Sequence, residues 1–420
     1  MNRIAVVGGG GAGLLSAWFL QSTHSVVLFE EEPFLGGHAH SVPVSTDRGV
    51  VWADTGFRYF FPHTYPIFTG LLKTLQVPTV TREAGMSFSD GQGARTLTTP
   101  PTNARTLFTL VSSPQNLLWS TSLYWFLRSG LPLVAAQDWR LSLRDYLVAS
   151  RIPLSVQQNY LVPALAAFWG APVADMPDFP AYDVLRVMQQ GKFGTPYFSF
   201  VEGGASTYAR TVREQSPAVR VETGAPVRRL RRDEQGWMVL RDSGEEGPFD
   251  QVIVATPSYV VEALLGDHPL ARVAAGFRHF PTQIVIHRDP AQMPRDHFRW
   301  TNLNVRFDGT HAWTTEWAGR DLRQNVFRTW LPPGHPEPAQ VEHRRTFRHL
   351  LVDGQSRTRQ LEIAQLQGRD GVFLAGMYTC DVDNHESVAA SAVAVAERLS
   401  PESPQLAQLH AQLGTSMQPR

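Results

Sequence analysis

The chain has 420 residues, of which 43% are hydrophobic and 18% are charged, and its formal net charge at pH 7 is zero. This is the composition of a globular protein with room for two lobes, and the balanced charge argues against a nucleic-acid partner. The single cysteine, Cys380, excludes an intramolecular disulfide framework and a cysteine-rich metal site, and we predict no metal.

The N-terminal segment predicts a strand, a glycine-rich turn, a helix and a second strand. Residues 3–7 are typical of a buried parallel strand, residues 13–21 of a helix and residues 25–30 of another strand. Together they predict a βαβ unit. Because the first strand begins at Arg3, with no basic segment and separate apolar stretch before it, we expect no signal peptide and a cytoplasmic location.

The turn of this unit carries the pattern Gly8-x-Gly10-x-x-Gly13, which is typical of dinucleotide-binding folds. Gly8 allows the tight turn, Gly10 lets the backbone approach a diphosphate, and Gly13 lets the helix pack closely on the strand. Gly11 and Ala12 are also predicted cofactor contacts, although Gly11 occupies a variable position of such turns. The helix N-terminus offers its amides and the positive end of its dipole to the diphosphate.

An acidic residue and a second glycine pair follow the turn. Glu30 ends the second strand, where a carboxylate accepts hydrogen bonds from a ribose and disfavours a 2′-phosphate. Gly36 and Gly37 come six and seven residues later, and His38 follows them. We expect His38 to be either a cofactor contact or a loop residue that only forms local hydrogen bonds.

The middle of the chain, from about Thr64 to Gln190, predicts mostly helices joined by aromatic-rich turns. Its most apolar window, Leu117 to Ala136, contains arginine, glycine and proline too often for a membrane-spanning helix. We interpret this window as a core or pocket helix, with a membrane-surface element as the alternative. Large aromatic side chains of this region are either core residues or the wall of a tunnel: Phe108, Trp119, Tyr124, Trp125, Phe126, Phe168 and Trp169.

The remaining sequence returns to strands. Strand-like runs occur at 219–224, 226–232, 236–242 and 250–257, and a helix is predicted at 259–265. A further set near 282–288, 301–307, 311–317 and 325–331 predicts an antiparallel sheet. The final segment, 371–399, predicts a strand, a loop and a helix, and we expect the tail after Pro401 to be loosely ordered.

Several of these segments, in this order, resemble the two-domain flavoproteins that include monoamine oxidases, phytoene desaturases and protoporphyrinogen oxidases. The pair Gly36-Gly37 resembles their extended fingerprint, in which arginine stands where this chain has His38. "ADTGFRYF", "VETGAPV", "DQVIVATP" and "GVFLAGMYTC…HESVAAS" resemble their later cofactor segments. Members with covalent flavin carry the cysteine well before the Ala-Gly strand, so the resemblance implies non-covalent FAD and a small buried Cys380.

The resemblance also implies where the cofactor contacts lie. Thr55, Gly56 and Phe57 would pass beside the flavin ring, and the backbone at Val227 would meet the adenine. Ala255 and Thr256 would run under the cofactor. Gly376 would lie near the ribityl chain or diphosphate, and the amides around Glu386, Ser387 and Val388 would face the pyrimidine end of the flavin.

A narrower resemblance covers most of residues 3–400. "YLVPALAAFWGAPVADMPDFPA", "VEGGASTYA" and "IVIHRDPAQMP" are similar to segments of bacterial FAD-dependent amine-oxidase-like proteins associated with cyclopropane fatty acid synthase. It implies a two-lobe α/β fold. We expect a Rossmann-like FAD-binding lobe from residues 1–63, 203–265 and 355–400, a substrate lobe of antiparallel sheet and helices from residues 64–202 and 266–354, and a tail at 401–420.

Four residues are predicted to take part in catalysis: Arg58, Tyr59, Tyr378 and His385. Arg58 is either a bidentate anchor for a carboxylate or a structural ion pair. His385 is either a general acid or base near neutral pH or a hydrogen-bonding residue at a helix start. Tyr378 is predicted to form one wall beside the ring, and His63 is a further polar candidate. Asp381 and Asp383 are expected to cap or solvate their loop.

Amine oxidases of the superfamily typically hold a lysine near flavin N5, and neither Lys73 nor Lys192 lies in the matching region around residues 281–289. We therefore expect an FAD-dependent oxidoreductase that transfers a hydride to or from flavin N5 on a lipophilic fatty acyl or polyene substrate, by desaturation, saturation or double-bond isomerisation. The alternatives are oxidation of a C–N bond and a non-catalytic flavin-binding accessory protein of a lipid-modifying enzyme. Expected partners are the lipophilic substrate, the membrane periphery and that enzyme.

Overall fold

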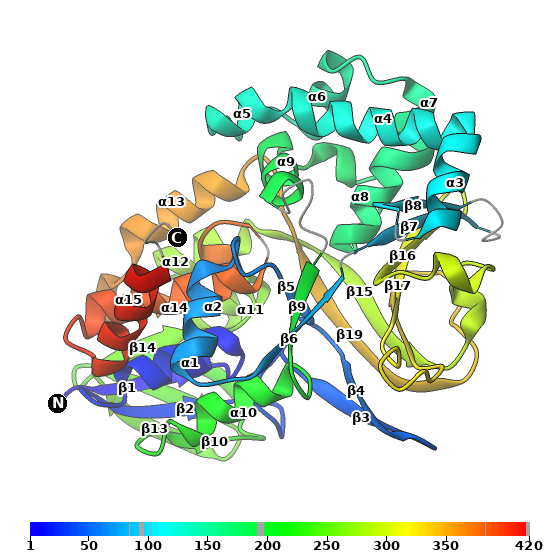
Figure 1. Ribbon diagram of the computed structural model, residues 1–420. Coiled ribbons are helices and arrows are strands. Elements are labelled where there is room, and N and C mark those ends of the chain that lie inside the picture. The colour runs from blue at the N-terminus through cyan, green and yellow to red at the C-terminus, as the bar shows by residue number, and fades with distance from the viewer. Residues whose placement is uncertain (84, 92–95, 102, 191–196, 383, 417–420) are drawn as a thin grey trace.

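The computed structural model describes residues 1–83, 85–91, 96–101, 103–190, 197–382 and 384–416. A parallel five-stranded sheet of order β10-β2-β1-β14-β20 forms the centre of the first lobe (Figure 1). The sheet gathers apolar runs from distant parts of the chain, most of them buried as in parallel sheets covered on both faces. Its strands are β1 (Arg3–Val7), β2 (Ser25–Phe29), β10 (Arg220–Glu222), β14 (Gln251–Val254) and β20 (Val372–Leu374).

Helix α1 (Gly11–Leu20) is buried along its whole length because it is apolar on every side. It packs between the sheet, α14 (His385–Leu399) and α10 (Ser206–Glu214). The other face of the sheet is covered by α11 (Ser258–Leu265), α12 (Pro269–Ala275) and α13 (Ser356–Leu366), and by an antiparallel sheet of β11 (Val227–Arg232), β12 (Trp237–Arg241) and β13 (Gly244–Phe249). The predicted βαβ unit is confirmed.

The second lobe contains a seven-stranded sheet of order β19-β15-β18-β17-β16-β7-β8, antiparallel except where β7 pairs with β16. The predicted antiparallel strands are confirmed, and three further strands extend the sheet at its two edges. The strands are β7 (Met86–Asp90), β8 (Thr96–Thr99), β15 (Arg278–His287), β16 (Leu303–Phe307), β17 (Ala312–Trp317), β18 (Phe327–Leu331) and β19 (Val341–Leu351).

A helical insert lies over this sheet at the top of Figure 1, and a separate hydrophobic core fills the space between insert and sheet. Its helices are α3 (Ala104–Ser112), α4 (Pro114–Ser129), α5 (Leu131–Ala135), α6 (Leu143–Ala149), α7 (Leu154–Val156), α8 (Val162–Trp169) and α9 (Ala181–Gln190). Shorter turns of helix are η1 (Gln157–Leu161) and η2 (Met176–Asp178) here, and η3 (Pro290–Gln292), η4 (His297–Arg299), η5 (Arg369–Gly371) and η6 (Met377–Thr379) elsewhere.

Two small sheets and one helix join the lobes. The hairpin of β3 (Ser41–Thr46) and β4 (Gly49–Asp54) packs on the large sheet, with Val44 and Val51 against Ile284 and Ile286. The other sheet has the order β5-β9-β6 and consists of β5 (Tyr59–Phe60), β9 (Tyr197–Val201) and β6 (Thr79–Glu83). Helix α2 (Pro66–Thr74) packs against α14.

The predicted helical region and the C-terminal tail each contain structure that the sequence pattern did not predict. Residues from Thr64 to Gln190 are mostly helical, as predicted, but three strands, β6, β7 and β8, lie between α2 and the first helix of the insert. These strands are short and rich in threonine and serine, so their apolar pattern is weak, and pairing with distant strands decides their structure. The tail after Pro401 contains α15 (Pro404–Ser416), whose Leu406 and Leu409 are buried in the core that contains α1.

The predicted α/β fold class is confirmed, whereas the residue boundaries proposed for the two lobes stay a prediction. No helix within the described part of the chain combines the length and the apolar character needed to span a membrane.

The contact between α15 and α2 predicts a measurable contribution to stability. Leu409 is fully buried, and its Cδ1 lies 3.1 Å from the position that a Cβ on Gly70 would take. We expect Leu409→Ala to lower the free energy of unfolding by about 2–4 kcal/mol, measured by urea denaturation, because the cavity cannot fully collapse. Leu361→Ala, at a side chain that is 57% exposed, is the matched control, with a change of less than about 0.5 kcal/mol. Equal effects of the two substitutions would contradict the packing of α15.

Candidate functional site

The glycine-rich turn joins β1 to α1 and leaves open space beside one of its glycines. A Cβ on Gly8, where φ is +106°, would lie 2.7 Å from the Ala255 carbonyl oxygen, and one on Gly13 would lie 1.9 Å from the Gly8 carbonyl oxygen. Both positions therefore require glycine. A Cβ on Gly10 would lie 3.9 Å from the Cα of Gly37, which is its nearest neighbour within the described residues apart from the adjoining chain. The turn is tightly packed on two sides and open in front of Gly10, where α1 begins.

Gly11 does not behave as a variable position in this chain. A Cβ there would lie 2.9 Å from Cγ1 of Val388 and 3.2 Å from Cε1 of His385, both on α14. The expectation that the residue at this point is free to vary is therefore wrong, because a neighbouring helix far away in sequence occupies the space. Ala12 is buried in the first turn of α1.

Glu30 and the second glycine pair lie against the turn. The Gly9 amide donates to Oε2 of Glu30 at 2.5 Å, and burial raises the pKa of this carboxyl group. The Gly36 amide donates to the Gly9 carbonyl at 2.8 Å, and Gly37, with φ of +55°, lies beside Gly10. The residues predicted to hold a diphosphate and a ribose are thus assembled at the edge of the parallel sheet formed by the carboxyl ends of β1 and β2.

Two further segments approach the same edge of the sheet. The Ala225 amide donates to the Glu30 carbonyl at 2.8 Å, which brings the start of β11, at Val227, close to the acidic residue. Ala255 donates its amide to the Val7 carbonyl at 2.7 Å and leads into Thr256, whose hydroxyl bonds to the Pro257 carbonyl.

The segment Thr55 to Phe57 runs beside His38. The Phe57 amide donates to the His38 carbonyl at 2.7 Å, and a Cβ on Gly56 would lie 2.2 Å from the same oxygen, so this approach requires glycine. The Thr55 amide donates to the His40 carbonyl at 2.8 Å. The Phe57 ring stacks on the His385 ring, with centroids 4.1 Å apart. His38, Phe57 and His385, predicted from three separate motifs, meet here.

The N-terminus of α14 differs from the expectation. Asn384, the residue before the helix, accepts the Ser387 amide on its side chain at 2.9 Å, and its carbonyl accepts the Val388 amide at 3.4 Å. The Ser387 and Val388 amides are therefore already bonded within their own helix end, because asparagine is a strong N-cap. Gly376 donates its amide to the Ser391 hydroxyl at 2.9 Å.

The Glu386 side chain has a role that the sequence did not reveal. Its two carboxylate oxygens accept the amides of Ile67 and Phe68, both at 2.9 Å, at the start of α2. Burial raises the pKa of Glu386 to about 7, although the two amides oppose this shift. Glu386 thus links the start of α14 to the start of α2.

A cavity of about 170 Å³, here named the inner cavity, lies between this edge of the first lobe and the helical insert. Four residues from the predicted cofactor segments line it: His38, Gly56, Phe57 and His385. Opposite them are apolar side chains, many aromatic, from α8, α9 and the large sheet: Phe168, Trp169, Val187, Trp330 and Phe347. The inner cavity therefore brings the candidate cofactor residues into contact with an apolar wall.

The charged side chains that line the inner cavity form one cluster. Glu316 of β17 lies between Arg58 and Arg328, with its Oε2 2.8 Å from Arg58 Nε and its Oε1 2.6 Å from Arg328 Nη1. Glu316 and Arg328 are buried, and Arg58 is nearly so. Two guanidinium groups and one carboxylate of the lining meet there. The buried carboxyl group of Asp54, which lines the neighbouring cavity, also interacts electrostatically with both arginines, and burial raises its pKa.

Arg328 also holds the Thr55 segment in place. Its Nε donates to the Asp54 carbonyl at 2.8 Å and its Nη2 donates to the Gly56 carbonyl at 2.6 Å. The sequence reasoning missed both Glu316 and Arg328. The sequence carried a signal, because Glu316 and Arg328 are each the only charged residue of their strand. In the structure the two residues lie opposite each other where β17 pairs with β18.

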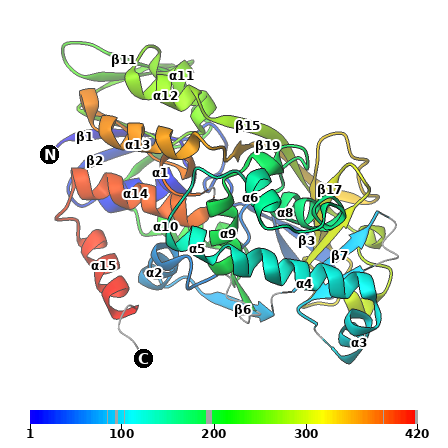
Figure 2. The ribbon, with the colours of Figure 1, turned by 90° about the horizontal axis from the view of Figure 1, so that it is seen from above.

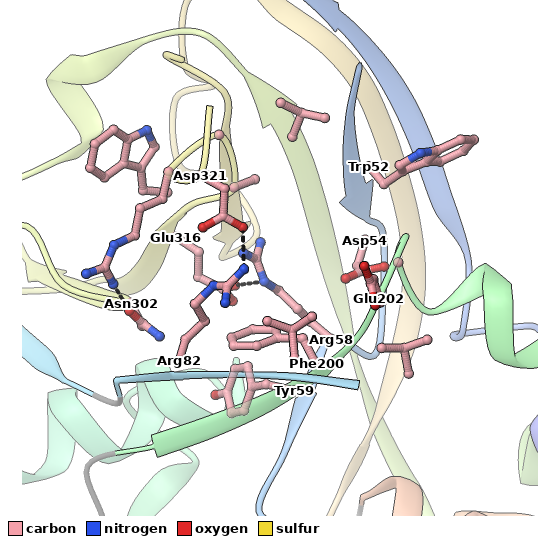
Figure 3. Close-up of a pocket in the computed structure, with 18 of the residues that line it drawn as sticks. Trp52, Asp54, Arg58, Tyr59, Arg82, Phe200, Glu202, Asn302, Glu316 and Asp321 are labelled. Carbon is pink, nitrogen blue, oxygen red and sulfur yellow. Dashed lines mark hydrogen bonds and ion pairs between the residues drawn. The ribbon is translucent and has the colours of Figure 1, made fainter. Parts of the chain in front are cut away.

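A second cavity of about 350 Å³, here named the outer cavity, lies on the other side of this cluster (Figure 3). Arg58, Tyr59 and Glu316 line both cavities. The outer cavity is more polar, and the Arg82–Asp321 ion pair lies at 2.6 Å on its rim. The Arg58–Glu316 pair therefore lies between the inner cavity and a more polar one.

Three predicted polar candidates are placed differently from the expectation. Tyr378 lies in the core below the sheet, against Phe277, and is not among the described residues that line either cavity. Its neighbour Met377 lines the inner cavity instead, because η6 points successive side chains in different directions. His63 is exposed. Burial lowers the pKa of His385 to about 3, so this imidazole is neutral near pH 7 and cannot donate a proton as an imidazolium.

The other residues of the C-terminal loop have structural partners. Burial raises the pKa of the Cys380 thiol to about 12, although the residue as a whole is only half-buried, so the predicted small buried residue is confirmed in part. Asp381 pairs with Arg186 and Arg357 and does not merely solvate its loop. Asp383 and Lys192 lie outside the described residues, and Lys73 is exposed on α2. Tyr59 is buried deeply enough to raise the pKa of its hydroxyl.

The aromatic residues of the insert divide into three groups. Trp119 and Phe126 are core residues, as the first interpretation predicts. Phe168 and Trp169 line the inner cavity, as the second predicts. Phe108, Tyr124 and Trp125 are exposed, which neither interpretation predicts.

Comparison with known proteins gives the following relatives. The family model described as flavin containing amine oxidoreductase matches residues 12–337. A curated relative, uncharacterized protein R188 of Acanthamoeba polyphaga mimivirus, is 32% identical over 80 residues, which span 18% of this chain and 15% of that protein. The chain thus spans only a small part of the length of that relative.

Solved structures resemble the chain along nearly its whole length. A provisionally assigned protoporphyrinogen oxidase from Exiguobacterium sp. 255-15 has a TM-score of 0.68 at 17% identity, covering 96% of this chain and 99% of that one. A fatty acid isomerase of P. acnes that produces CLA has a TM-score of 0.69 at 14% identity, with 95% and 99% covered. Cyclohexylamine oxidase from Brevibacterium oxydans IH-35A has a TM-score of 0.65 at 14% identity, with 95% and 99% covered. These likenesses show the shared fold.

The buried cluster predicts a strong dependence of stability on Glu316. Glu316→Gln removes the carboxylate that pairs directly with Arg58 and Arg328, and we expect the free energy of unfolding to fall by about 3–5 kcal/mol in urea denaturation. Asp242→Asn is the matched control, because Asp242 pairs with Arg228 at 2.6 Å on the surface, and its loss should leave stability unchanged within error. If both variants unfold at the same urea concentration as the parent chain, the Glu316 cluster does not stabilise the fold.

Proposed function

Since the chain belongs to the flavin containing amine oxidoreductase family, with FAD as its cofactor, we propose that it is an oxidoreductase that acts on a long-chain unsaturated carboxylic acid. The observation that carries this proposal is the inner cavity, in which a largely apolar wall meets a single charged cluster that places two arginines and one glutamate in the lining.

The residues at the edge of the parallel sheet fit FAD. The open space in front of Gly10 accommodates a diphosphate at the start of α1, and Glu30 lies where a ribose is bound in such folds. The high pKa of the buried Cys380 thiol argues for non-covalent binding. When bound, FAD supplies a hydride acceptor and donor. We propose that these residues hold it: Gly8, Gly10, Gly11, Ala12, Gly13, Glu30, Gly36, Gly37, His38, Thr55, Gly56, Phe57, Val227, Ala255, Thr256, Gly376 and Glu386.

The wall of the inner cavity favours an apolar chain. Trp169, Trp330 and Phe347 present rigid apolar surface, and Val187 and Met377 add flexible or branched aliphatic surface. Such a wall excludes water and orients an acyl chain mainly by burying it. His385 remains neutral at the cofactor side of the cavity, so it contributes shape and polarity there and is not an acid near pH 7.

The charged cluster selects the sign of the substrate head group. The ion pair uses the Nε of Arg58, and a guanidinium has four further N–H groups on its terminal nitrogens, which match a carboxylate. In surroundings of low dielectric constant, two guanidinium groups beside one carboxylate in the lining repel an ammonium ion and attract a carboxylate. The raised pKa of the buried Asp54 limits the opposing charge from its side of the cluster. A primary amine is therefore a poor fit, which places oxidation of a C–N bond second.

Among the three reaction forms, we place double-bond isomerisation first. The sequence contains one Gly-x-Gly-x-x-Gly pattern and no second one for a nicotinamide cofactor. Isomerisation returns the hydride to the same substrate and so needs no second redox partner, whereas desaturation and saturation each need one. The association with a cyclopropane fatty acid synthase, or with another lipid-modifying enzyme, stays a prediction from the resemblance.

Substitution at Gly10 tests the cofactor site. We expect Gly10→Val to place a side chain in the open space of the turn and to abolish FAD retention, measured as the ratio of absorbance at 450 nm to that at 280 nm in the purified protein. Gly354→Val is the control, because a Cβ at Gly354 also meets open space but lies far from the turn in sequence. Circular dichroism distinguishes loss of FAD from loss of fold. Normal flavin content in Gly10→Val would contradict the proposed site.

The substrate is tested by anaerobic incubation of the FAD-loaded protein with an unsaturated fatty acid, its methyl ester or a long-chain amine. We expect a shifted double bond in the free acid, detected by mass spectrometry of derivatised products, and no product from the amine. Arg58→Met should raise the KM for the free acid about tenfold and change that for the ester little, because only the acid uses the charge. Arg82→Met, on the rim of the outer cavity, is the control.

Three outcomes of this experiment contradict the proposal. Bleaching of the flavin by the amine, followed by release of peroxide when oxygen is admitted, would make the protein an amine oxidase. FAD binding without turnover of any of the three compounds would favour the accessory protein. An equal rise in KM for acid and ester in Arg58→Met would show that the arginine does not bind the carboxylate.

A further inference from the structure

The helical insert carries most of the large apolar side chains that the fold leaves exposed. Ten of the sixteen in the described chain lie between residues 107 and 154. They are Leu107, Phe108, Val111, Leu117, Leu118, Tyr124, Trp125, Leu131, Val148 and Leu154. The concentration within one segment is unlike the scattered exposure of single apolar residues on most soluble surfaces.

Helix α4 shows that this exposure is a property of a whole helix face. Trp119 and Phe126 point inward into the core of the insert. Leu117, Leu118 and Trp125 lie on the opposite, exposed side at helical spacing. An ordinary surface helix is polar on its outer face, so α4 is apolar on two faces.

The charge pattern of the same segment has one sign. No acidic residue occurs in the sequence between Asp90 and Asp138, whereas Arg105 and Arg128 are both exposed on α3 and α4. Serine, threonine and asparagine supply the other polar groups of α4. A surface that combines exposed aliphatic and aromatic side chains with arginine, and that lacks carboxylates, is complementary to anionic lipid headgroups over acyl chains.

The position of these helices allows them to meet a flat surface. Both overall views place α3, α4 and α5 on the outside of the molecule (Figure 1 and Figure 2). The inner side of the insert reaches the inner cavity through Trp169 of α8 and Val187 of α9. Leu185 of α9 packs directly under the α4–α5 junction, 2.6 Å from the position that a Cβ on Gly130 would take.

We propose that the outer face of α3, α4 and α5, here named the insert face, binds the surface of an anionic lipid bilayer as a peripheral contact. Leu107, Phe108, Val111, Leu117 and Leu118 enter the boundary between headgroups and acyl chains, and Arg105 and Arg128 contact lipid phosphates. Contact between the insert faces of two copies is disfavoured, because the arginines of one copy would find no carboxylates on the insert face of the other. The proposal goes beyond the proposed function and does not depend on it.

Vesicle flotation with the full FAD-loaded chain tests this proposal. We expect co-flotation with vesicles of phosphatidylcholine and phosphatidylglycerol at 3:1, and weaker binding to pure phosphatidylcholine. The triple variant Phe108→Gln, Val111→Gln and Leu118→Gln should reduce the bound fraction about tenfold. The double variant Leu361→Gln and Tyr259→Gln replaces exposed apolar residues elsewhere and should bind like the parent chain. Arg128→Glu should weaken binding to the anionic vesicles only, whereas Arg210→Glu on α10 should not.

Unchanged melting temperatures and flavin spectra show that the variants fold, so a loss of flotation reports on the insert face itself. Two results would overturn the proposal. One is equal flotation of the triple variant and the parent chain. The other is absence of vesicle binding together with a dimer, seen by sedimentation velocity, that the triple variant disrupts, because the insert face would then bind a second copy.

Discussion

The structure of the site depends on one buried carboxylate held between two guanidinium groups. Glu316 pairs with Arg58 and Arg328, and Arg328 in turn binds the carbonyl oxygens of Asp54 and Gly56. Three chain segments, residues 54–58, β17 and β18, are thus joined where burial makes an unpaired charge costly. Gly56 also packs closely against the His38 carbonyl, where there is no room for a side chain. The contacts of Arg328 and Gly56 together fix the segment from Thr55 to Phe57 beside the inner cavity. The cluster therefore connects the large sheet of one lobe with the cofactor edge of the other.

The cluster also places charge at one end of the inner cavity. The lining carries the guanidinium groups of Arg58 and Arg328 and the carboxylate of Glu316. Because Coulomb interactions are strong where water is excluded, these groups dominate the electrostatics of a largely apolar cavity. The fold is shared by proteins named for amines and for a fatty acid, so the fold by itself does not identify a substrate.

The helical insert has two apolar sides with different environments. Its inner side forms a close-packed core with the large sheet and contributes part of the cavity wall. Its outer side exposes leucine, phenylalanine and tryptophan among hydroxyl groups and arginines. The average hydrophobicity of such a segment is high although no described helix could cross a membrane, so composition alone suggests a core helix. Only the packing reveals which apolar side chains remain uncovered.

The sequence by itself determined the βαβ unit, the glycine turn, Glu30 and the second glycine pair, because each depends on a few neighbouring residues and on backbone conformations that only glycine adopts easily. It could not determine contacts between side chains hundreds of residues apart. Tertiary packing turned Tyr378 into the core and Met377 toward the cavity, bound the Glu386 carboxylate to the start of α2, and lowered the pKa of His385 by removing water from it. It also paired Glu316 with Arg328 through strand register. The identity of the cofactor is therefore a local property of this chain, whereas the charge and shape of the cavity arise only when the two lobes come together.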